Sequence, residues 1–418
     1  MKIQRYLAPT SAPISWREIG RAFLGIGRGP QERADREAEL SAYFGAKHVF
    51  LLSSGRAALA TIVCGLAAGS SRRNVIIPAY TCYSVPSAII RAGCRVVLCD
   101  VDPHTLDFDY SDLQRQVDGE TLCIIAPHLL GQAVDIPRMR AIAQAYHVPV
   151  VEDAAQAMGG ILDGRWLGTQ GDVGFFSLGR GKNVTAGSGG VILTSSDEMA
   201  SQLRAVYEEL PEAPLMSQVV NVMMVSAMRL ALHPRLYWLP SGLTFLGLGE
   251  TIYDCDFALH KMDGARSGLL AGWQDRLRVS NSERVDRASQ YLDRLPTSLQ
   301  RVDPVRTKGV VYLRLPLLMP TADSKAAVCA LSRSQGLGVG PLYPAPISEI
   351  PELKGTLVPR RFEGAQTLAE RLVTLPVHHY VERADIERIC RALQATTEND
   401  STSDIEREQV LSTGSHPL

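Results

Sequence analysis

Short apolar runs alternate with stretches of helical spacing along the first half of the chain. Strands are predicted where β-branched and other apolar residues cluster, over residues 48–52, 74–78, 95–102, 148–151 and 172–177, and a strand followed by a loop is predicted over residues 122–131. Helices are predicted between and after them, over residues 31–45, 53–69, 111–117, 136–147 and 197–210. Strand alternating with helix is typical of a mainly parallel sheet that is covered on both faces. The pattern therefore predicts an α/β fold.

The second half of the chain has a different order of elements. A long charged helix is predicted over 267–295, then a strand over 310–319 and helices over 324–336 and 384–393. We therefore expect four parts: an irregular N-terminal segment over 1–30, a large α/β domain over 31–255, a small C-terminal α+β domain over 256–395, and a disordered polar tail over 396–418.

An unusually apolar segment, residues 213–249, lies within the large domain. Residues 213–228 carry no charge, but the run is shorter than a membrane span needs, and Pro234 and Pro240 interrupt the rest of the segment. A buried helix or a subunit contact is the favoured interpretation, so we expect no membrane contact. An interfacial hairpin stays as the alternative, because Met, Leu, Tyr and Trp cluster beside Arg229 and Arg235.

Composition excludes several classes of protein. The formal net charge of the 418 residues is −1, so no broad basic field points to nucleic acid. The 8 cysteines are spread singly, with no CxxC pair and no Cys/His spacing of a zinc site, so no metal is expected. They are typical of small core residues in a reducing compartment, and the N-terminal residues lack an apolar signal core. We expect a cytoplasmic protein.

The residues that carry chemistry gather between positions 148 and 194. The apolar run VPVV ends at Glu152 and Asp153, and the run DVGFFS ends at Ser177. Lys182 follows Ser177 by five residues, inside the glycine-rich stretch LGRGKNVTAGSGG. Residues just past the carboxyl ends of strands line the ligand crevice of an open α/β sheet. A carboxylate, a hydroxyl and an amine are therefore expected near one another.

These three groups suit pyridoxal 5′-phosphate (PLP). Its aldehyde needs an amine for a Schiff base, its pyridine nitrogen needs a carboxylate, and its phosphate needs hydroxyl and N–H donors. Lys182, Asp153 and Ser177 could fill those roles. From spacing alone, a helix-capping Asp153 and a surface Lys182 carry equal weight. A nucleotide-binding P-loop is excluded, because GRGKN lacks the required upstream glycine and has Asn183 in place of Ser or Thr.

Three motifs in the right order resemble a known family. EDAAQA at 152–157, GDVGFFS at 171–177 and KNVTAGSGGVILT at 182–194 resemble the DegT/StrS family of fold-type-I PLP-dependent aminotransferases, and the resemblance runs from about residue 40 to about residue 393. It implies a large domain built on a mainly parallel mixed sheet and a smaller C-terminal α+β domain. It also implies site roles: Lys182 as the Schiff-base lysine, Asp153 at the pyridine nitrogen, Gln156 near the ring oxygen and Ser177 at the phosphate.

The turn SSGRA resembles the family's phosphate-binding S-G-T-A-A turn. Gly55, Arg56 and Ala57 are therefore expected to bind the cofactor, with free N–H groups at a helix start. Arg56 replaces the family's threonine, and Leu259 replaces an asparagine that contacts the phosphate of the other subunit. We expect Arg56 to take over phosphate binding, with Arg180 as the rival.

The aromatic residue that stacks on the cofactor ring in the family is not matched. Cys82 stands at its position, so Tyr83 is taken as the cofactor-binding neighbour.

Further matches concern the substrate. His128 lies in HLLGQ, Tyr343 in YPAPISEIP and His378 in LPVHHY, and with Arg180 they are the candidate substrate residues. For His128, a loop histidine with satisfied hydrogen bonds is the favoured alternative. Ser348 stands where the family usually has histidine.

The resemblance implies the reaction and the partners. We expect a homodimeric aminotransferase that moves an amino group from an amino-acid donor such as glutamate to a keto group, of a nucleotide-linked keto sugar above all. Lys182 would act as its general acid and base. The alternatives are a non-sugar ketone as acceptor, dehydration on the same fold, or a non-catalytic regulatory homologue. Lys182 argues against dehydration, because the relatives that dehydrate have histidine at that position.

Overall fold

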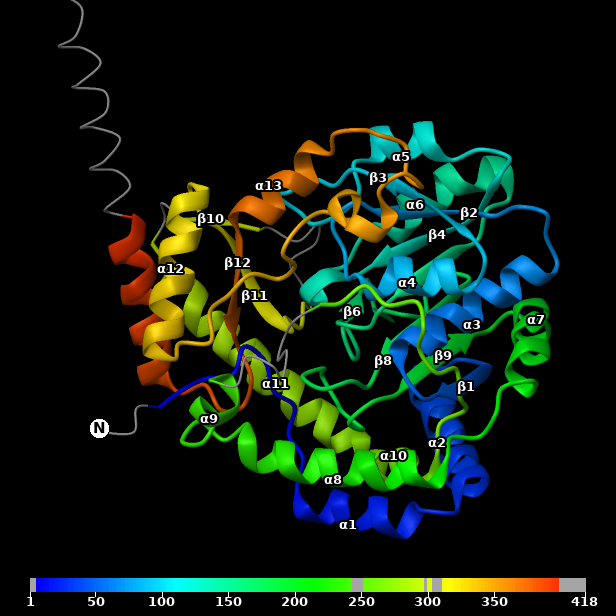
Figure 1. Ribbon diagram of the computed structural model, residues 1–418, viewed down its shortest axis with the longest axis horizontal. Helices are drawn as coiled ribbons and strands as arrows, with labels where there is room; N and C mark the ends of the chain where they lie inside the picture. The colour runs from blue at the N-terminus through cyan, green and yellow to red at the C-terminus, as the bar shows by residue number, and fades with distance from the viewer. Residues whose placement is uncertain (1–4, 243–250, 297–298, 303–309, 398–418) are drawn as a thin grey trace, which may run out of the picture.

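The computed structural model describes residues 5–242, 251–296, 299–302 and 310–397 (Figure 1). The expectations for residues 243–249 and 398–418 therefore lie outside the described residues. The central feature is a seven-stranded sheet with the order β1-β9-β8-β5-β4-β2-β3. Its strands are β1 (His48–Leu52), β2 (Asn74–Pro78), β3 (Arg95–Cys99), β4 (Thr121–Pro127), β5 (Val150–Asp153), β8 (Val173–Ser177) and β9 (Gly190–Thr194).

The sheet is mixed and mainly parallel, as the sequence pattern predicts. Strands β3, β2, β4, β5 and β8 form four successive parallel pairs, whereas β9 is antiparallel to both β8 and β1. The carboxyl ends of β4, β5 and β8 therefore share one edge, where a ligand crevice is expected. The prediction of an α/β fold is confirmed.

Helices cover both faces of this sheet. On β5, Val151 packs in the cluster that contains α3 and α4, whereas Val150 packs in the cluster that contains α5 and α6. This alternation explains why the strands are continuously apolar. The surrounding helices are α2 (Gly29–Phe44), α3 (Gly55–Ala68), α4 (Ser84–Arg91), α5 (Tyr110–Gln116), α6 (Ile136–Ala143) and α7 (Asp197–Glu208).

A second, three-stranded sheet forms the core of the C-terminal part. It comprises β10 (Gln300–Arg301), β11 (Arg314–Leu318) and β12 (Leu372–Pro376), with α12 (Ala322–Gln335), α13 (Glu363–Arg371) and the helical residues 383–397 beside it. Short elements connect the larger ones: β6 (Ile161–Leu162), β7 (Arg165–Trp166), η1 (Leu129–Gly131), η2 (Gln144–Tyr146), η4 (Ile347–Glu349) and η5 (Pro351–Leu353).

The single helix predicted over 267–295 is two helices. Helix α10 (Gly264–Leu270) ends before Gly272, whose φ of 72° is left-handed and breaks the helical path, and α11 (Trp273–Leu292) begins after it. Trp273 packs in the core of the large sheet, whereas Tyr291 packs in the core of the small one. Helix α11 therefore joins both cores, and the boundary expected at residue 256 stays a prediction.

The N-terminal segment differs from the irregular structure expected over residues 1–30. Helix α1 (Trp16–Gly25) forms there, because Ser15 and Glu18 make a capping box at its start. The helix packs on α10 at glycine contacts: a Cβ on Gly25 would lie 2.1 Å from the backbone oxygen of Gly264. The two backbones therefore approach more closely than any larger residue allows.

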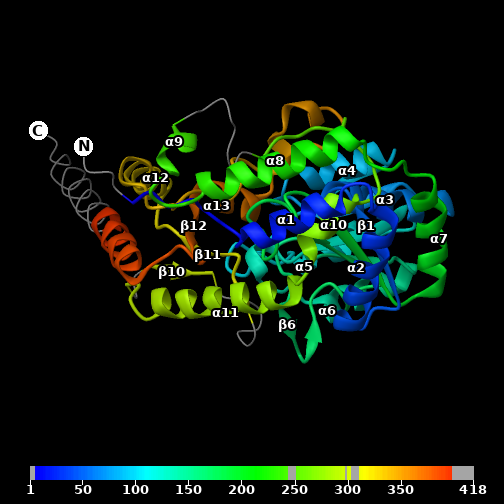
Figure 2. The ribbon, with the colours of Figure 1, turned by 90° about the horizontal axis from the view of Figure 1, so that it is seen from below.

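The apolar segment after residue 213 forms α8 (Leu215–Ala231) and α9 (Trp238–Ser241). Helix α8 lies beside α1 in both views (Figures 1 and 2). Its buried side includes Gln218 and Asn221, whereas Met216 and Met223 are 72% and 65% exposed. The expectation of a buried helix is therefore wrong for this face, and a subunit contact is left as the favoured interpretation. No helix in the described part of the chain is long and apolar enough to cross a membrane.

The α1–α10 contact gives a stability prediction with a control on the same helix. Gly25→Ala should lower the free energy of unfolding by about 1–3 kcal/mol, because its methyl group forces the two backbones apart. Gly20→Ala should raise it by about 0.5–1 kcal/mol, since Gly20 has open space around it and alanine favours the helix. Urea denaturation of both variants measures this, and equal effects would contradict the packing.

Candidate active site

Lys182 lies on the turn that joins β8 to β9, and this turn is held at several points. The Ser188 hydroxyl donates to the Ser53 carbonyl at 2.5 Å, and the Asn183 amide donates to Asn281 of α11 at 3.0 Å. Gly181, just before the lysine, has a left-handed φ of 77°. The turn thus fixes the backbone from which the Lys182 side chain extends.

Asp153, the last residue of β5, is coupled electrostatically to Lys182. Burial lowers the pKa of the Lys182 amine, and the charge of Asp153 offsets this only in part. Burial likewise raises the pKa of the Asp153 carboxyl, which accepts a hydrogen bond from the Ala155 N–H at 3.0 Å. Lys182 Nζ has no hydrogen bond to any described residue. A partly exposed amine whose protonated form is disfavoured is suited to attack an aldehyde.

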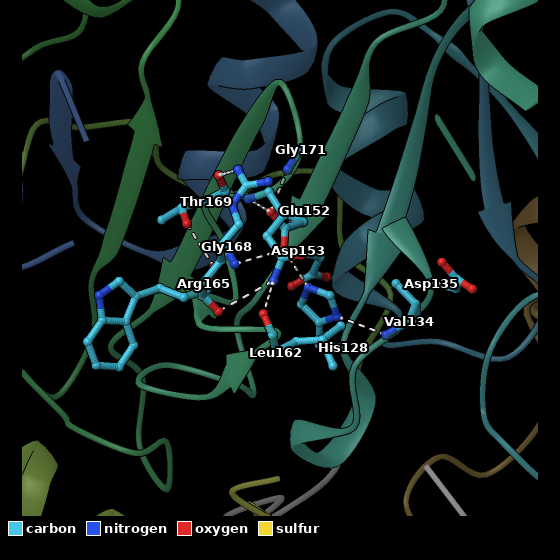
Figure 3. Close-up of polar contacts among 12 residues, drawn as sticks. His128, Val134, Asp135, Glu152, Asp153, Leu162, Arg165, Gly168, Thr169 and Gly171 are labelled. Carbon is cyan, nitrogen blue, oxygen red and sulfur yellow. Dashed lines mark hydrogen bonds and ion pairs between the residues drawn. The ribbon is translucent and has the colours of Figure 1, made fainter. Parts of the chain in front are cut away.

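The neighbouring carboxylate, Glu152, is held by several hydrogen bonds on the face of β5 opposite to Asp153 (Figure 3). It accepts N–H groups from Gly168, Gln170 and Gly171 at 2.9, 2.5 and 2.7 Å, and it bonds to His128 Nε2 at 2.8 Å. Although burial raises the pKa of the Glu152 carboxyl, the His128 contact and these N–H groups outweigh it, and the pKa is lowered. Because successive strand residues face opposite sides, fixing Glu152 fixes the direction of Asp153.

His128 is committed to this network. The Val134 N–H donates to Nδ1 at 3.2 Å, so Nδ1 carries no proton and Nε2 donates to Glu152. Both ring nitrogens are therefore occupied, and the ring is 1% exposed. The structure favours the alternative of a satisfied loop histidine over substrate binding. The role of Glu152 was missed from sequence, although its place beside Asp153 was visible.

The start of α3 provides donors for an anion. The Ser54 hydroxyl accepts the Ala57 N–H at 3.0 Å, so Ala57 is already capped, whereas Gly55 and Arg56 have no backbone acceptor among the described residues. A Cβ on Gly55 would lie 2.8 Å from the Ser177 hydroxyl oxygen. Glycine thus lets the Ser177 hydroxyl sit directly against the helix start, where an anion is favoured.

The guanidinium of Arg56 points elsewhere. It contacts the carbonyl and carboxylate oxygens of Asp254 at 3.1 and 3.3 Å and lies 5.1 Å from the centre of the Phe257 ring. Its expected contact with a phosphate therefore stays a prediction, which requires the guanidinium to leave Asp254. The rival, Arg180, is exposed at the surface.

Tyr343 is joined to Gln156 at the same crevice. The Gln156 amide donates to the Tyr343 hydroxyl at 2.8 Å and accepts the Leu130 N–H at 2.8 Å. The Tyr80 hydroxyl accepts the Tyr343 N–H at 3.1 Å, so the two rings are held together. Burial, followed by the nearby Cys82 and Asp153, raises the pKa of the Tyr343 hydroxyl well above its usual value. Sequence reasoning singled out Tyr343 and Gln156 but missed Tyr80, which follows the end of β2.

Cys82 and Tyr83 have different surroundings. The Cys82 thiol lies close enough to Lys182 to affect its pKa, and its sulfur accepts the Ser84 hydroxyl at 3.0 Å. The Tyr83 hydroxyl instead donates to the Ala345 carbonyl at 3.2 Å. Cys82, rather than Tyr83, therefore affects the pKa of Lys182. Stacking of Tyr83 on the cofactor ring stays a prediction.

His378 lies apart from these contacts. Its Nε2 bonds to the Ala8 carbonyl at 2.8 Å, and its Nδ1 accepts the Tyr380 N–H at 3.4 Å. Burial holds its pKa well below the usual value, so the ring is neutral. The structure therefore places this candidate substrate residue in an internal network.

The Glu152 network gives a pH-dependent prediction. The folded pKa of this carboxyl is lowered, so its contribution to stability is present above the unfolded pKa and is lost as the pH falls through the folded pKa. Glu152→Gln should cost about 3–5 kcal/mol of unfolding free energy at pH 7, because the amide leaves buried N–H donors unpaired. The cost should shrink below about pH 4.

The matched control is Asp197→Asn, which removes an exposed carboxylate paired with Lys47 and His48. It should leave stability nearly unchanged, because solvent screens an exposed pair. Denaturation at several pH values measures both variants. If the loss of unfolding free energy caused by Glu152→Gln grows as the pH falls, the proposed role of the Glu152 carboxylate is wrong.

Known proteins resemble this chain in sequence over part of its length. The chain is 36% identical over 173 residues to a pleiotropic regulatory protein of Geobacillus stearothermophilus, which covers 41% of this chain and 46% of that protein. It is 34% identical over 185 residues to L-glutamine:2-deoxy-scyllo-inosose aminotransferase of Streptoalloteichus tenebrarius, which covers 44% and 43%. The matched part thus spans less than half the length of these curated relatives.

Solved structures share the fold over nearly the whole chain. Helicobacter pylori PseC, an aminotransferase of pseudoaminic acid biosynthesis, superposes with a TM-score of 0.76 at 14% identity, over 94% of this chain and all of that one. DesI, solved with its TDP-sugar product, gives 0.76 at 19% identity, over 97% and 96%. The sequence model of the DegT/DnrJ/EryC1/StrS aminotransferase family matches residues 26–216 and 270–394. The chain therefore belongs to the DegT/DnrJ/EryC1/StrS aminotransferase family.

Proposed function

We propose that this chain is a PLP-dependent aminotransferase that transfers an amino group from an amino-acid donor, such as glutamate, to the keto group of a nucleotide-linked sugar. The observation that carries the proposal is the pair of Lys182 and Asp153, a partly buried amine and a buried carboxylate whose charges affect the pKa of each other. The name of one relative, GDP-perosamine synthase of Vibrio cholerae, supports the substrate class. The name of another, L-glutamine:2-deoxy-scyllo-inosose aminotransferase, supports amino transfer from an amino-acid donor.

The residues present fit the cofactor. The free N–H groups of Gly55 and Arg56 and the hydroxyl of Ser177 form a cradle for a phosphate, which a Cβ on Gly55 would fill. Asp153 offers a buried carboxylate for a protonated ring nitrogen, and Lys182 offers a partly buried amine. When bound, PLP supplies an aldehyde that takes up the donor nitrogen and a ring that accepts electrons.

The side chains of this chain then have separate tasks. Asp153 holds a proton on the ring nitrogen, and an ion pair there keeps its carboxylate charged despite burial. Lys182 moves a proton between its amine and the reacting carbon, which its lowered pKa favours near neutral pH. Gln156 and Tyr343, joined by their hydrogen bond, close one side of the crevice.

A regulatory role is the second candidate, because the relative of Geobacillus stearothermophilus is named a pleiotropic regulatory protein. A purely regulatory chain has no need of a lysine whose charged form is disfavoured by its surroundings, since this costs stability. The Lys182 environment therefore favours an enzyme.

The lysine assignment is tested by reductive trapping. Borohydride treatment of PLP-loaded protein should attach a phosphopyridoxyl group to Lys182, and Lys182→Ala should abolish it, because no other amine shares this buried environment with Asp153 in the described chain. Peptide mass spectrometry locates the group. Lys354→Ala, at an exposed position, is the control and should trap normally. A group on another lysine in the wild-type protein would refute the assignment.

We also propose a homodimer that buries the apolar face of α8 and α1. Exposed side chains of this face are Trp16, Phe23, Leu24, Leu215, Met216, Val220, Met223, Met224 and Leu230. Large contiguous apolar surfaces are rare on monomers and mark contacts. The buried side of α8 also reaches the lysine turn, since the Asn221 amide donates to the Ala186 carbonyl at 3.2 Å. A second copy seated on α8 would thus brace the turn that bears Lys182.

The dimer is tested by charge insertion. The double variant Met216→Glu, Met223→Glu should sediment as a monomer at micromolar concentration, because two carboxylates cannot be buried unpaired in an apolar contact. Val358→Glu is the control: Val358 is 82% exposed on a different part of the chain, and its variant should stay dimeric. A wild-type protein that sediments as a monomer would rule the proposal out.

A further inference from the structure

Arg314, the first residue of β11, is a partly buried arginine with almost no partner among the described residues. Its Nη2 lies 3.5 Å from the Gly340 carbonyl, which is the limit of a hydrogen bond, and its Nε is buried without any partner in the described chain. No aspartate or glutamate among the described residues forms an ion pair with it. The Nε of this guanidinium has lost contact with water without gaining a partner, which is costly unless an anion meets it.

Arg284 is a buried arginine whose hydrogen bonds are satisfied within the protein, and it serves as a comparison for Arg314. Its guanidinium donates to the carbonyls of Leu313 and Ser11 at 2.7 and 2.8 Å and to the Ser280 hydroxyl at 3.4 Å. The donors of Arg284 therefore tie α11 to neighbouring backbone. Arg314, one residue beyond Leu313, leaves most of its donors unused.

The surroundings of Arg314 connect it to the candidate active site. The Gly340 carbonyl lies three residues before Tyr343, whose hydroxyl bonds to Gln156. Burial lowers the pKa of Arg314 to about 10, and the nearest groups that oppose this are Tyr343 and Tyr80. The same Tyr343 is coupled to Asp153. Arg314 is thus linked through Gly340 to the segment that bears Tyr343, and it lies close enough to Tyr343 and Tyr80 for them to affect its pKa.

Other arginines of the site are less suited to a small anion. Arg56 is paired with Asp254, and Arg180 is exposed to solvent. A planar guanidinium with free donors binds a carboxylate or a phosphate through two parallel hydrogen bonds, and a buried one does so most strongly.

We propose that Arg314 binds the anionic group of a substrate in the Lys182 crevice: the carboxylate of the amino donor or the phosphate of the nucleotide-linked acceptor. The proposal rests on the proposed function for the identity of the substrate. The lack of hydrogen-bond partners for the Arg314 guanidinium does not depend on which substrate binds. Two oxygens of either anion would fill the donors that the protein leaves free.

Binding without reaction tests the proposal first. Glutarate, an unreactive dicarboxylate, and uridine diphosphate are titrated calorimetrically into PLP-loaded wild type, Arg314→Gln and Arg314→Lys. Arg314→Gln should bind one of the two about ten- to a hundredfold more weakly than wild type, as expected for a charge-assisted bond. Arg314→Lys should recover part of the lost affinity, because lysine keeps the positive charge but lacks the two parallel N–H donors of a guanidinium. The affected ligand identifies the source of the anion.

Arg333→Gln is the matched control, since Arg333 is an exposed arginine on α12 of the same part of the chain. It should bind both ligands as wild type does. Thermal unfolding and reductive trapping on Lys182 establish that Arg314→Gln is folded and loaded. Equal affinities of wild type and Arg314→Gln for both ligands, or no binding of either by wild type, would overturn the proposal.

Single-turnover reactions separate this result from the proposed function. If glutarate is the affected ligand, Arg314→Gln should need a ten- to hundredfold higher glutamate concentration for the half-maximal rate, with a smaller change in the maximal rate. 1-Butylamine, which has no carboxylate, should react equally with both proteins. A wild type that binds the anion through Arg314 but transfers no amino group would contradict the proposed function alone.

Discussion

The structure depends on holding two groups of opposite charge, the partly buried Lys182 and the buried Asp153, near each other at the carboxyl edge of the sheet. Burial disfavours the charged form of each, which lowers the pKa of the amine and raises that of the carboxyl. Removing such a pair from water costs free energy, so the surrounding chain must hold it in place. Two separate devices do so: the braced turn between β8 and β9 for the lysine, and the Glu152 network for the aspartate. This arrangement is useful for a ligand that needs an amine that gives up its proton and a carboxylate shielded from solvent.

The sheet topology brings these devices together. Strand β9 runs against its neighbours, so the chain returns from β8 through a turn at the carboxyl edge of the parallel strands. That turn is where Lys182 lies, and β5 delivers Asp153 to the same edge. Arg314 begins β11 of the other sheet, and its Nη2 lies 3.5 Å from the carbonyl of Gly340, in the segment that leads to Tyr343. Helix α11 connects the cores of the two sheets.

Much of this could be predicted from the sequence. The alternation of strand and helix indicated the α/β fold, which is confirmed, and the spacing of Ser177 and Lys182 placed both at one edge. What could not be predicted depends on contacts between distant residues. The pairing of Arg56 with Asp254 joins positions that no local pattern relates, and the occupied ring of His128 depends on Glu152 and Val134. Periodicity also fails for α8, whose polar Gln218 and Asn221 face inward.

The most direct test of the central claim is the absorption spectrum of the PLP-loaded protein during addition of an amino donor. If Lys182 and Asp153 form a working cofactor site, the loaded wild type has a visible band that free PLP lacks. Glutamate or another amino-acid donor should bleach this band, and a keto acceptor should restore it. A spectrum that equals that of free PLP, or a band that no amino donor bleaches, would contradict the account.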